Sequence, residues 1–340
     1  MTLFAQLPLR EQAVFFRELA TRRDVSLVIA EKDFWVCWTL GRLFAIAELG
    51  TELVFKGGTS LSKVFGVIDR FSEDIDLSIS PTLLGWKESD LDEAPSSTKR
   101  GKLMKRLESD CIDAVRARFQ PQIETAIREI LGAPPSDAWL QFQIDTASNS
   151  PVLLFSYPSS TGVRSAYIHP VVKIEFGSLT DQRPRGYHWI SPMIAEMAPG
   201  EFDDCTIEVV ALELERTFWE KATILHAEYH RPPAQPLRDR FARHYADFVA
   251  LWRHPRGRDA RTDFKLLERV TIYKSRFFRS SWARYDTARP GTLRLLPPAA
   301  REAELKADLQ KMRAMFLTSP PEFNDLLTVL HEAEEAINGG

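Results

Sequence analysis

The chain has 340 residues, which favours two domains or one core with large additions. Hydrophobic residues make up 44% and charged residues 27%, a composition typical of folded globular proteins that excludes disordered and fibrous classes. The formal net charge of -3, from 44 basic and 47 acidic residues, gives no overall attraction to nucleic acid. Any contact with RNA or DNA must therefore be local.

The 3 cysteines are widely spaced, which excludes a disulfide framework or a zinc cluster and is typical of a reducing compartment. The N-terminus lacks a basic stretch followed by an apolar segment, and no window approaches the length of a membrane span. We therefore expect a cytoplasmic protein that makes no membrane contact.

Helical spacing of apolar residues predicts two helices at the start of the chain, over residues 7–23 and 28–49. Aromatic residues of the second helix have the spacing of core positions, which favours packing over base stacking. Residues 52–56 read as a short buried strand broken by two glycines, after which Thr59 can cap a helix. Apolar and polar residues then alternate over residues 74–79, the pattern of a strand with one buried face.

A polar loop over residues 82–101 precedes a long helix over about 102–131. Pro121 kinks this helix or splits it in two, because proline cannot donate a helical hydrogen bond. The middle of the chain is rich in strand-like runs. These runs are residues 139–144, 152–157, 171–176 and 206–210.

The last third of the chain reads as helical. Residues 213–229 form one predicted helix, and helical patterns continue from residue 237 to an amphipathic helix over 321–337. These elements predict an α/β (α+β) fold in which a mixed sheet with helices forms an N-terminal lobe over residues 1–210. A C-terminal helical lobe follows over residues 211–340.

A glycine-rich turn follows the first predicted strand, with the sequence Gly57-Gly-Thr-Ser-Leu-Ser-Lys63 at the start of a helix. Glycines let a backbone approach a ligand closely, and the unpaired N–H groups of a helix start favour phosphate. The alternative is a tight turn with an ordinary helix cap. The turn taken alone does not separate the two interpretations.

Two carboxylates, Asp74 and Asp76, share one face of the second predicted strand. Their Cα atoms are expected about 6.6 Å apart, so both side chains can reach one cleft. A pair of magnesium ions would offset the repulsion between them and clamp a phosphoryl displacement. The alternative for an isolated Asp-x-Asp is the solvated face of an edge strand.

The order of strand, Gly-Gly-Thr-Ser turn, helix and Asp-x-Asp strand resembles the minimal nucleotidyltransferase core of polymerase-β-like enzymes. In that core the turn holds a triphosphate and the carboxylates bind magnesium. A third carboxylate is needed, and Glu175 supplies it on a later strand, with Asp145 as the alternative donor. Lys173 lies on the same strand face as Glu175, where it could pair with phosphate oxygens or form a surface ion pair.

Further blocks of sequence point to a named family. In chain order they are Glu31-Lys-Asp-Phe-Trp-Val36, Leu53-Val-Phe-Lys-Gly-Gly-Thr-Ser-Leu-Ser-Lys63, Arg70-Phe-Ser-Glu-Asp-Ile-Asp-Leu77, Glu215-Arg-Thr-Phe-Trp-Glu-Lys221 and Arg243-His-Tyr-Ala-Asp247. These blocks resemble the AbiEii nucleotidyltransferase toxins. The resemblance implies a bilobed toxin of a toxin–antitoxin and abortive-infection system, with a cognate antitoxin as partner. It also implies transfer of a nucleoside monophosphate from a nucleoside triphosphate (NTP).

The motifs and the resemblance together predict three sets of site residues. The nucleotide-binding set is Gly57, Gly58, Thr59, Ser60, Lys63, Lys173 and Lys221. The metal set, for two magnesium ions, is Asp74, Asp76 and Glu175. The catalytic set is Asp74, Asp76, Lys173, Glu175, Lys221 and Asp247.

The residues of the helical half also have simpler interpretations. Lys221 could be a surface lysine beside Glu220, and Asp247 could pair with Arg243 one helical turn away. His244 stands where many members of the family carry aspartate, so the acid–base role of that aspartate is not carried over. The spacing of His226 and His230 allows metal binding, but a solvated helix face is the favoured interpretation.

The predicted activity is magnesium-dependent transfer of a nucleotide to RNA, with the 3′ end of tRNA as the favoured acceptor. An arginine-rich stretch over residues 237–261 supports a local RNA contact, although a solvated basic face fits it equally. Two alternatives stay open: the same chemistry on a protein or small-molecule hydroxyl, and a non-catalytic nucleotide- or RNA-binding module held by an antitoxin.

Overall fold

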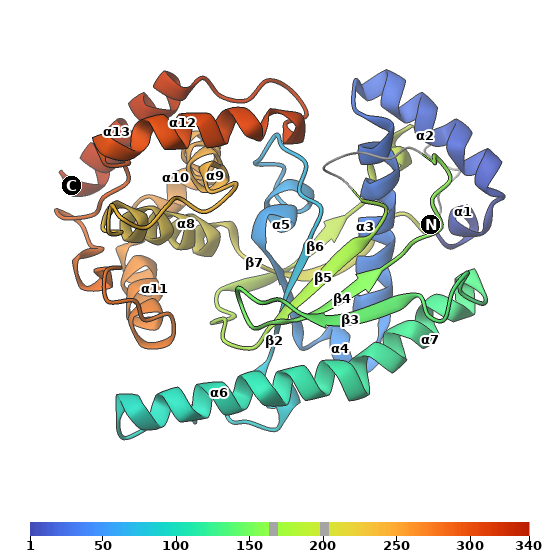
Figure 1. Ribbon diagram of the computed structural model, residues 1–340, viewed down its shortest axis with the longest axis horizontal. Coiled ribbons are helices and arrows are strands. Elements are labelled where there is room, and N and C mark those ends of the chain that lie inside the picture. Colours follow the sequence, from blue (N-terminus) through green and yellow to red (C-terminus); the bar gives the residue numbers. More distant parts are fainter. Residues whose placement is uncertain (163–168, 198–203, 340) are drawn as a thin grey trace. The chain divides into compact units, whose positions relative to one another are not determined.

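The computed structural model describes residues 1–162, 169–197 and 204–339, and the chain forms two compact units (Figure 1). The first unit comprises Met1–Val64 and Ser72–Ala211, and the second comprises Phe65–Phe71 and Leu212–Gly340. The segment Phe65–Phe71 thus belongs to the second unit, whereas the division expected from the sequence leaves it in the N-terminal lobe.

Helices open the first unit: α1 (Thr2–Gln6), α2 (Leu9–Arg23), α3 (Leu27–Ala45) and α4 (Ala47–Gly50). Ser26 caps α3, because its hydroxyl accepts a hydrogen bond of 3.3 Å from the backbone N–H of Ile29. The helices expected over residues 7–23 and 28–49 are confirmed, the second with a short break near its end.

Aromatic side chains of α3 lie in the core of the first unit. Trp35 and Trp38 are both 0% exposed and contact the rings of Tyr157 and Phe155, at centroid distances of 5.5 and 5.7 Å. Phe34 is equally buried. The prediction of core packing rather than base stacking is confirmed.

A 7-stranded mixed sheet forms the centre of the first unit, in the order β3-β4-β5-β2-β1-β7-β6 (Figure 1). The strands are β1 (Leu53–Lys56), β2 (Ile75–Ile79), β3 (Leu140–Ile144), β4 (Pro151–Phe155), β5 (Val172–Gly177), β6 (Arg185–Ile190) and β7 (Ile207–Leu212). Central strand β2 runs antiparallel to β1 and parallel to β5. The predicted α/β class is confirmed, and β6 is a strand that the sequence analysis missed.

The long helix expected before the strands is interrupted, as Pro121 indicated. It consists of α6 (Ser97–Ala114), a π-helical turn over Val115–Phe119 and α7 (Gln120–Leu131). Pro121 lies just after the π-helical turn, and because it has no N–H to donate, one hydrogen bond of the regular helix is missing there. The helix begins at Ser97, before the expected residue 102, because Ser96 caps it.

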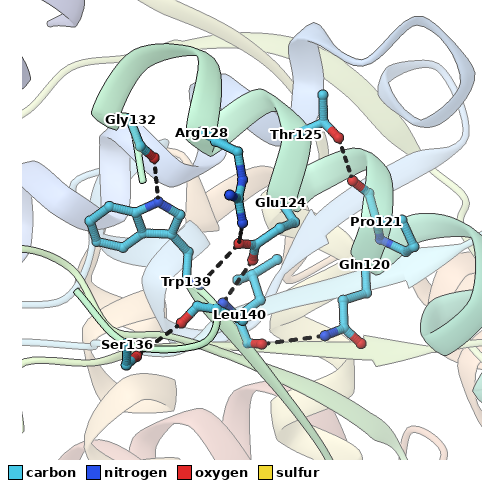
Figure 2. Close-up of polar contacts among 10 residues, drawn as sticks. Gln120, Pro121, Glu124, Thr125, Arg128, Gly132, Ser136, Trp139 and Leu140 are labelled. Atoms are coloured by element: carbon cyan, nitrogen blue, oxygen red, sulfur yellow. Dashed lines mark hydrogen bonds and ion pairs between the residues drawn. The ribbon is translucent and has the colours of Figure 1, made fainter. Parts of the chain in front are cut away.

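Polar contacts join α7 to the start of edge strand β3 (Figure 2). The carboxylate of Glu124 accepts hydrogen bonds of 3.0 Å from the backbone N–H groups of both Trp139 and Leu140. The indole N–H of Trp139 donates to the carbonyl of Gly132 at 3.0 Å. These bonds fix where β3 begins, at the end of the sheet farthest from β6.

The second unit is built from helices. Its longer helices are α8 (Leu214–Tyr229), α9 (Ala242–Arg253), α11 (Phe264–Phe277), α12 (Glu302–Lys311) and α13 (Phe323–Asn338), with the short α10 (Gly257–Ala260) between α9 and α11. The apolar face of α13 packs against α9. The amphipathic helix at the end of the chain therefore contributes to the core of this unit.

Backbone and side-chain contacts hold Phe65–Phe71 in the second unit. The N–H of Phe71 donates to the carbonyl of Met315 at 2.6 Å, and the N–H of Leu317 donates to the carbonyl of Asp69 at 3.2 Å. Because residue 72 begins the approach to β2, these contacts anchor the chain shortly before the Asp-x-Asp motif.

Candidate active site

The turn after β1 brings Asp76 against a glycine. Gly57 has a φ of +82°, a backbone conformation that favours glycine, and a Cβ at this position would lie 2.1 Å from Oδ2 of Asp76. No other residue type fits this contact without moving the carboxylate. The glycine-rich turn and the Asp-x-Asp strand are thus adjacent, as their order in the sequence indicated.

Helix α5 (Gly57–Lys63) starts at the first glycine of the turn, so Thr59 lies inside the helix and does not cap it. The Thr59 hydroxyl instead donates to the backbone carbonyl of Asp74 at 2.6 Å and contacts the Ser72 hydroxyl at 3.0 Å. Thr59 and Ser60 are both buried. Thr59 therefore fastens α5 to the strand that carries the carboxylates.

Two of the predicted carboxylates lie on neighbouring strands, and a third, Asp74, directly precedes β2. Asp76 of β2 is in register with Glu175 of β5, and Asp74 lies on the same face as Asp76, two residues earlier. Ile75 and Leu77 between and after them are fully buried on the opposite face. The parallel pairing of β2 and β5 thus produces the predicted juxtaposition of Asp74, Asp76 and Glu175.

Lys173 lies within this group. Its ammonium donates to Oε2 of Glu175 at 3.0 Å and to Oδ2 of Asp145 at 3.4 Å. Burial opposes the charged form of Lys173, but the hydrogen bond to Glu175 and the charges of Glu175, Asp74 and Asp145 raise its pKa overall. Glu175 and Asp145, the two candidates for the third carboxylate, thus share one cation.

The pair of Asp74 and Asp76 has the chemistry of a divalent cation site. Burial and the adjacent Asp76 carboxylate raise the pKa of Asp74 to about 6, so a cation there would relieve repulsion between two partly desolvated groups. Among the described residues, no three His, Cys, Asp or Glu side chains form a ready-made metal cage. Magnesium is commonly held by one or two carboxylates, with water and substrate phosphates completing its shell, which the pair fits.

Lys63, predicted to bind the nucleotide, points elsewhere. Its ammonium forms an ion pair with Asp33 of α3, and both side chains are largely buried. A second ion pair joins Lys32 of α3 to Glu73, the residue before Asp74. The sequence analysis did not predict these pairs, although charged residues within the apolar α3 were a signal that they need partners.

A buried ion cluster in the second unit contains both other predicted catalytic residues. Asp247 of α9 accepts from Nζ of Lys221 at 2.7 Å, and from Nε and a terminal nitrogen of Arg70 at 2.7 and 2.8 Å. Nζ of Lys221 also lies 3.2 Å from Nδ1 of His244. Lys221 is therefore buried rather than a surface lysine, and Asp247 has Arg70 and Lys221 as partners.

The charges in this cluster are shifted strongly. Burial alone would raise the pKa of Asp247, but Arg70 and Lys221 outweigh it and hold that pKa well below its usual range. Burial lowers the pKa of Lys221, with Asp247 opposing the shift. Burial and the charge of Lys221 lower the pKa of His244, so its neutral ring can accept a hydrogen bond from Lys221.

Two other sequence interpretations concern the second unit. His226 is fully buried, which corrects the expected solvated face: its Nε2 lies 3.0 Å from the carbonyl of Arg284 and its Nδ1 accepts from the N–H of Arg294. Most arginines of the arginine-rich stretch are exposed. Its exposed arginines are Arg238, Arg240, Arg253, Arg256 and Arg258.

Two surface grooves lie away from the predicted residues. A groove of about 460 Å³ lies along α11 and is lined by Phe264, Thr271 and Arg289, among others. A second, of about 510 Å³, lies beside Trp86 near α6. Neither is lined by a predicted site residue, so we assign the site from the carboxylate geometry rather than from concavity.

Comparison with known proteins agrees with this geometry. The family model of the nucleotidyl transferase AbiEii toxin of type IV toxin–antitoxin (TA) systems matches residues 38–331. The chain belongs to the AbiEii family. It is therefore a nucleotidyltransferase toxin that takes an NTP substrate, uses a divalent metal and has an antitoxin as partner.

Other comparisons add less. Among solved structures, MenT4, nucleotidyltransferase toxin Rv2826c from Mycobacterium tuberculosis H37Rv, is 16% identical, with 95% of this chain and 97% of that chain covered and a TM-score of 0.44. No curated protein sequence matches the chain. Of the helices in the described parts of this AbiEii protein, none combines the length and apolar character needed to cross a bilayer.

Proposed function

We propose that this AbiEii protein is a magnesium-dependent enzyme that transfers a nucleoside monophosphate from an NTP to RNA, with the 3′ end of tRNA as the favoured acceptor. The observation that supports it best is the register of Asp76 with Glu175, beside Asp74 and against the Gly57 turn. The carboxylates of Asp74 and Asp76 can ligate a metal ion, and they lie next to the start of α5. This arrangement suits a metal-bound triphosphate better than a neutral ligand.

In this proposal the acceptor hydroxyl attacks the α-phosphorus and pyrophosphate leaves. The residues of α5 that follow Gly57 orient the triphosphate, and Asp74 and Asp76 hold magnesium, which supplies charge neutralisation when bound. Lys173 offsets charge on the phosphate oxygens, and Glu175 receives the proton of the acceptor hydroxyl. The roles predicted for Lys63, Lys221 and Asp247 remain predictions, and each of these side chains forms a largely buried ion pair.

RNA is the favoured acceptor because an enzyme that acts on it needs phosphate contacts. The exposed arginines before, on and after α9 offer them on a protein whose net charge is only -3. NTPs, tRNA and a reducing environment for the three free cysteines also favour the cytoplasm. The alternative acceptor is a hydroxyl of a protein or small molecule, and membership of an enzyme family argues against a non-catalytic module.

The experiment is a transfer assay with NTPs labelled at the α-phosphate. Purified protein is incubated with magnesium, each of the four NTPs separately, and either total RNA or RNase-treated protein extract. The proposal predicts label in RNA, concentrated at tRNA 3′ ends and removed by mild 3′ exonuclease. Label in protein alone would move the acceptor to a protein hydroxyl, and pyrophosphate release without label in either polymer would indicate a small-molecule acceptor.

A further inference from the structure

Three charged residues follow one another in α3. Glu31, Lys32 and Asp33 are 1%, 3% and 3% exposed, in a helix whose other side chains are mostly apolar and buried. Removing a charge from water costs several kcal/mol unless partners compensate, so each of these residues needs a bonded partner. Successive residues lie about 100° apart around a helix, so the three side chains leave α3 in different directions.

Glu31 holds the chain that follows β4. Its carboxylate accepts hydrogen bonds from the Ser159 hydroxyl at 2.8 Å, the Ser160 N–H at 2.6 Å, the Ser160 hydroxyl at 2.8 Å and the Thr161 hydroxyl at 2.8 Å. Four donors saturate both oxygens of one buried carboxylate. This is a dedicated clamp on one short segment, Ser159–Thr161.

Lys32 holds the approaches to both carboxylate-bearing strands. Its ammonium forms an ion pair with Glu73, which is bonded directly to Asp74 along the chain. The same ammonium donates to the carbonyl of His169 at 3.1 Å, shortly before β5 with its Lys173 and Glu175. One cation thus connects the chain just before β2 with the chain just before β5.

Asp33 holds the far end of α5. One carboxylate oxygen pairs with Lys63, the last residue of α5, and the other accepts from the N–H of Met193 at 2.6 Å. Since α5 begins at Gly57, which contacts Asp76, Asp33 fixes the direction in which the start of this helix points.

We propose that Glu31, Lys32 and Asp33 form a positioning hub. This hub sets the relative placement of α5, the chain just before Asp74 and the chain just before β5. The inference rests on the proposed function, because the segments that the hub holds carry the residues to which that function gives a role. Fold stability alone does not account for it, since buried ion pairs contribute little more than apolar side chains of similar size.

The test replaces Lys32 with methionine, which keeps the length of the side chain and removes its charge, and with arginine as the conservative rescue. In a steady-state transfer assay, Lys32→Met lowers kcat roughly 10- to 100-fold, the range typical when a supporting residue is lost, with a much smaller change in KM for the NTP. Lys32→Arg recovers most of kcat. The control is Arg231→Met, which removes a buried cation paired with Glu228 at 3.3 Å in the second unit.

Hydrogen–deuterium exchange supplies a readout that does not need turnover. In Lys32→Met, amide exchange rises in residues 72–76 and 169–173, the two segments that Lys32 contacts, whereas in Arg231→Met it does not. A folded Lys32→Met protein with wild-type kcat and wild-type exchange in these segments would overturn the hub. If the wild-type protein transfers no nucleotide, the proposed function fails, and the exchange comparison still decides whether the hub holds these segments.

Discussion

At the scale of single residues, Gly57 leaves no room for a side chain beside Asp76. Gly57 and Gly85 have nearly equal φ values of +82° and +81°, but a Cβ at Gly85 would meet nothing within 4 Å. Alanine at either position strains the backbone by about 1 kcal/mol, and only at position 57 does a clash with Asp76 add to that loss of stability. Only Gly57→Ala displaces the Asp76 carboxylate.

We therefore expect Gly57→Ala to lower kcat for nucleotide transfer roughly 100-fold, the order of loss caused by displacing a reacting geometry by about 1 Å. Gly85→Ala should keep wild-type kcat. Thermal unfolding and transfer rates, measured side by side, check the pair. Equal activity in the two alanine variants would mean that Asp76 does not need its observed position.

A second residue, His226, predicts a pH dependence of stability. Burial lowers the pKa of His226 from 6.5 to about 4, since its ring is enclosed and its Nδ1 accepts a hydrogen bond. Between these values the unfolded chain binds a proton that the folded chain does not, so the free energy of unfolding falls as the pH falls. The total loss from this group is about 3 kcal/mol.

The replacement His226→Gln removes the titrating group. The stability advantage of the wild-type protein over this variant should shrink steadily from pH 7 to pH 4.5, as measured by urea unfolding at each pH. An advantage that stays constant across this range would show that His226 is not held neutral in the fold.

At the scale of elements, the anchoring of edge strand β3 by α7 is open to a direct test. Glu124 satisfies two backbone N–H groups of the strand start, whereas Glu129 on the same helix is exposed. Glu124→Ala leaves both donors without this acceptor and should lower the free energy of unfolding by about 1–3 kcal/mol. Glu129→Ala should change it by less than about 0.5 kcal/mol, so equal effects in chemical denaturation would contradict this role.

Helices and strands whose apolar residues recur at a regular spacing were predictable from the sequence. Strand β6 was not predicted, and its side chains show why. Its side chains Tyr187 and Trp189 are 71% and 62% exposed, so the large residues of this edge strand face outward. A reading that places large apolar residues inside cannot recognise such a strand. The start of α6 was placed late for a related reason, because its first turn is polar and is defined by the Ser96 cap.

At the scale of the whole molecule, the site was predictable where it depends on short spacings and on recognised blocks. Asp74 and Asp76 follow from the period of one strand, and Gly57 follows from the turn before it. Contacts between distant residues were not predictable. Arg70 and Asp247 are 177 positions apart and Lys32 and Glu73 are 41 apart, and only the folded chain shows that these charges meet.

The central claim is that Asp74 and Asp76 perform nucleotidyl transfer. It is tested most directly by the single-turnover rate of labelled nucleotide transfer in Asp76→Asn, with Asp325→Asn on the exposed face of α13 as the matched control. We expect Asp76→Asn to lose roughly 1,000-fold or more, as for other groups that stabilise transition-state charge, while keeping its fold. The control should match the wild-type rate. A well-folded Asp76→Asn protein that transfers nucleotide at the wild-type rate would contradict the account.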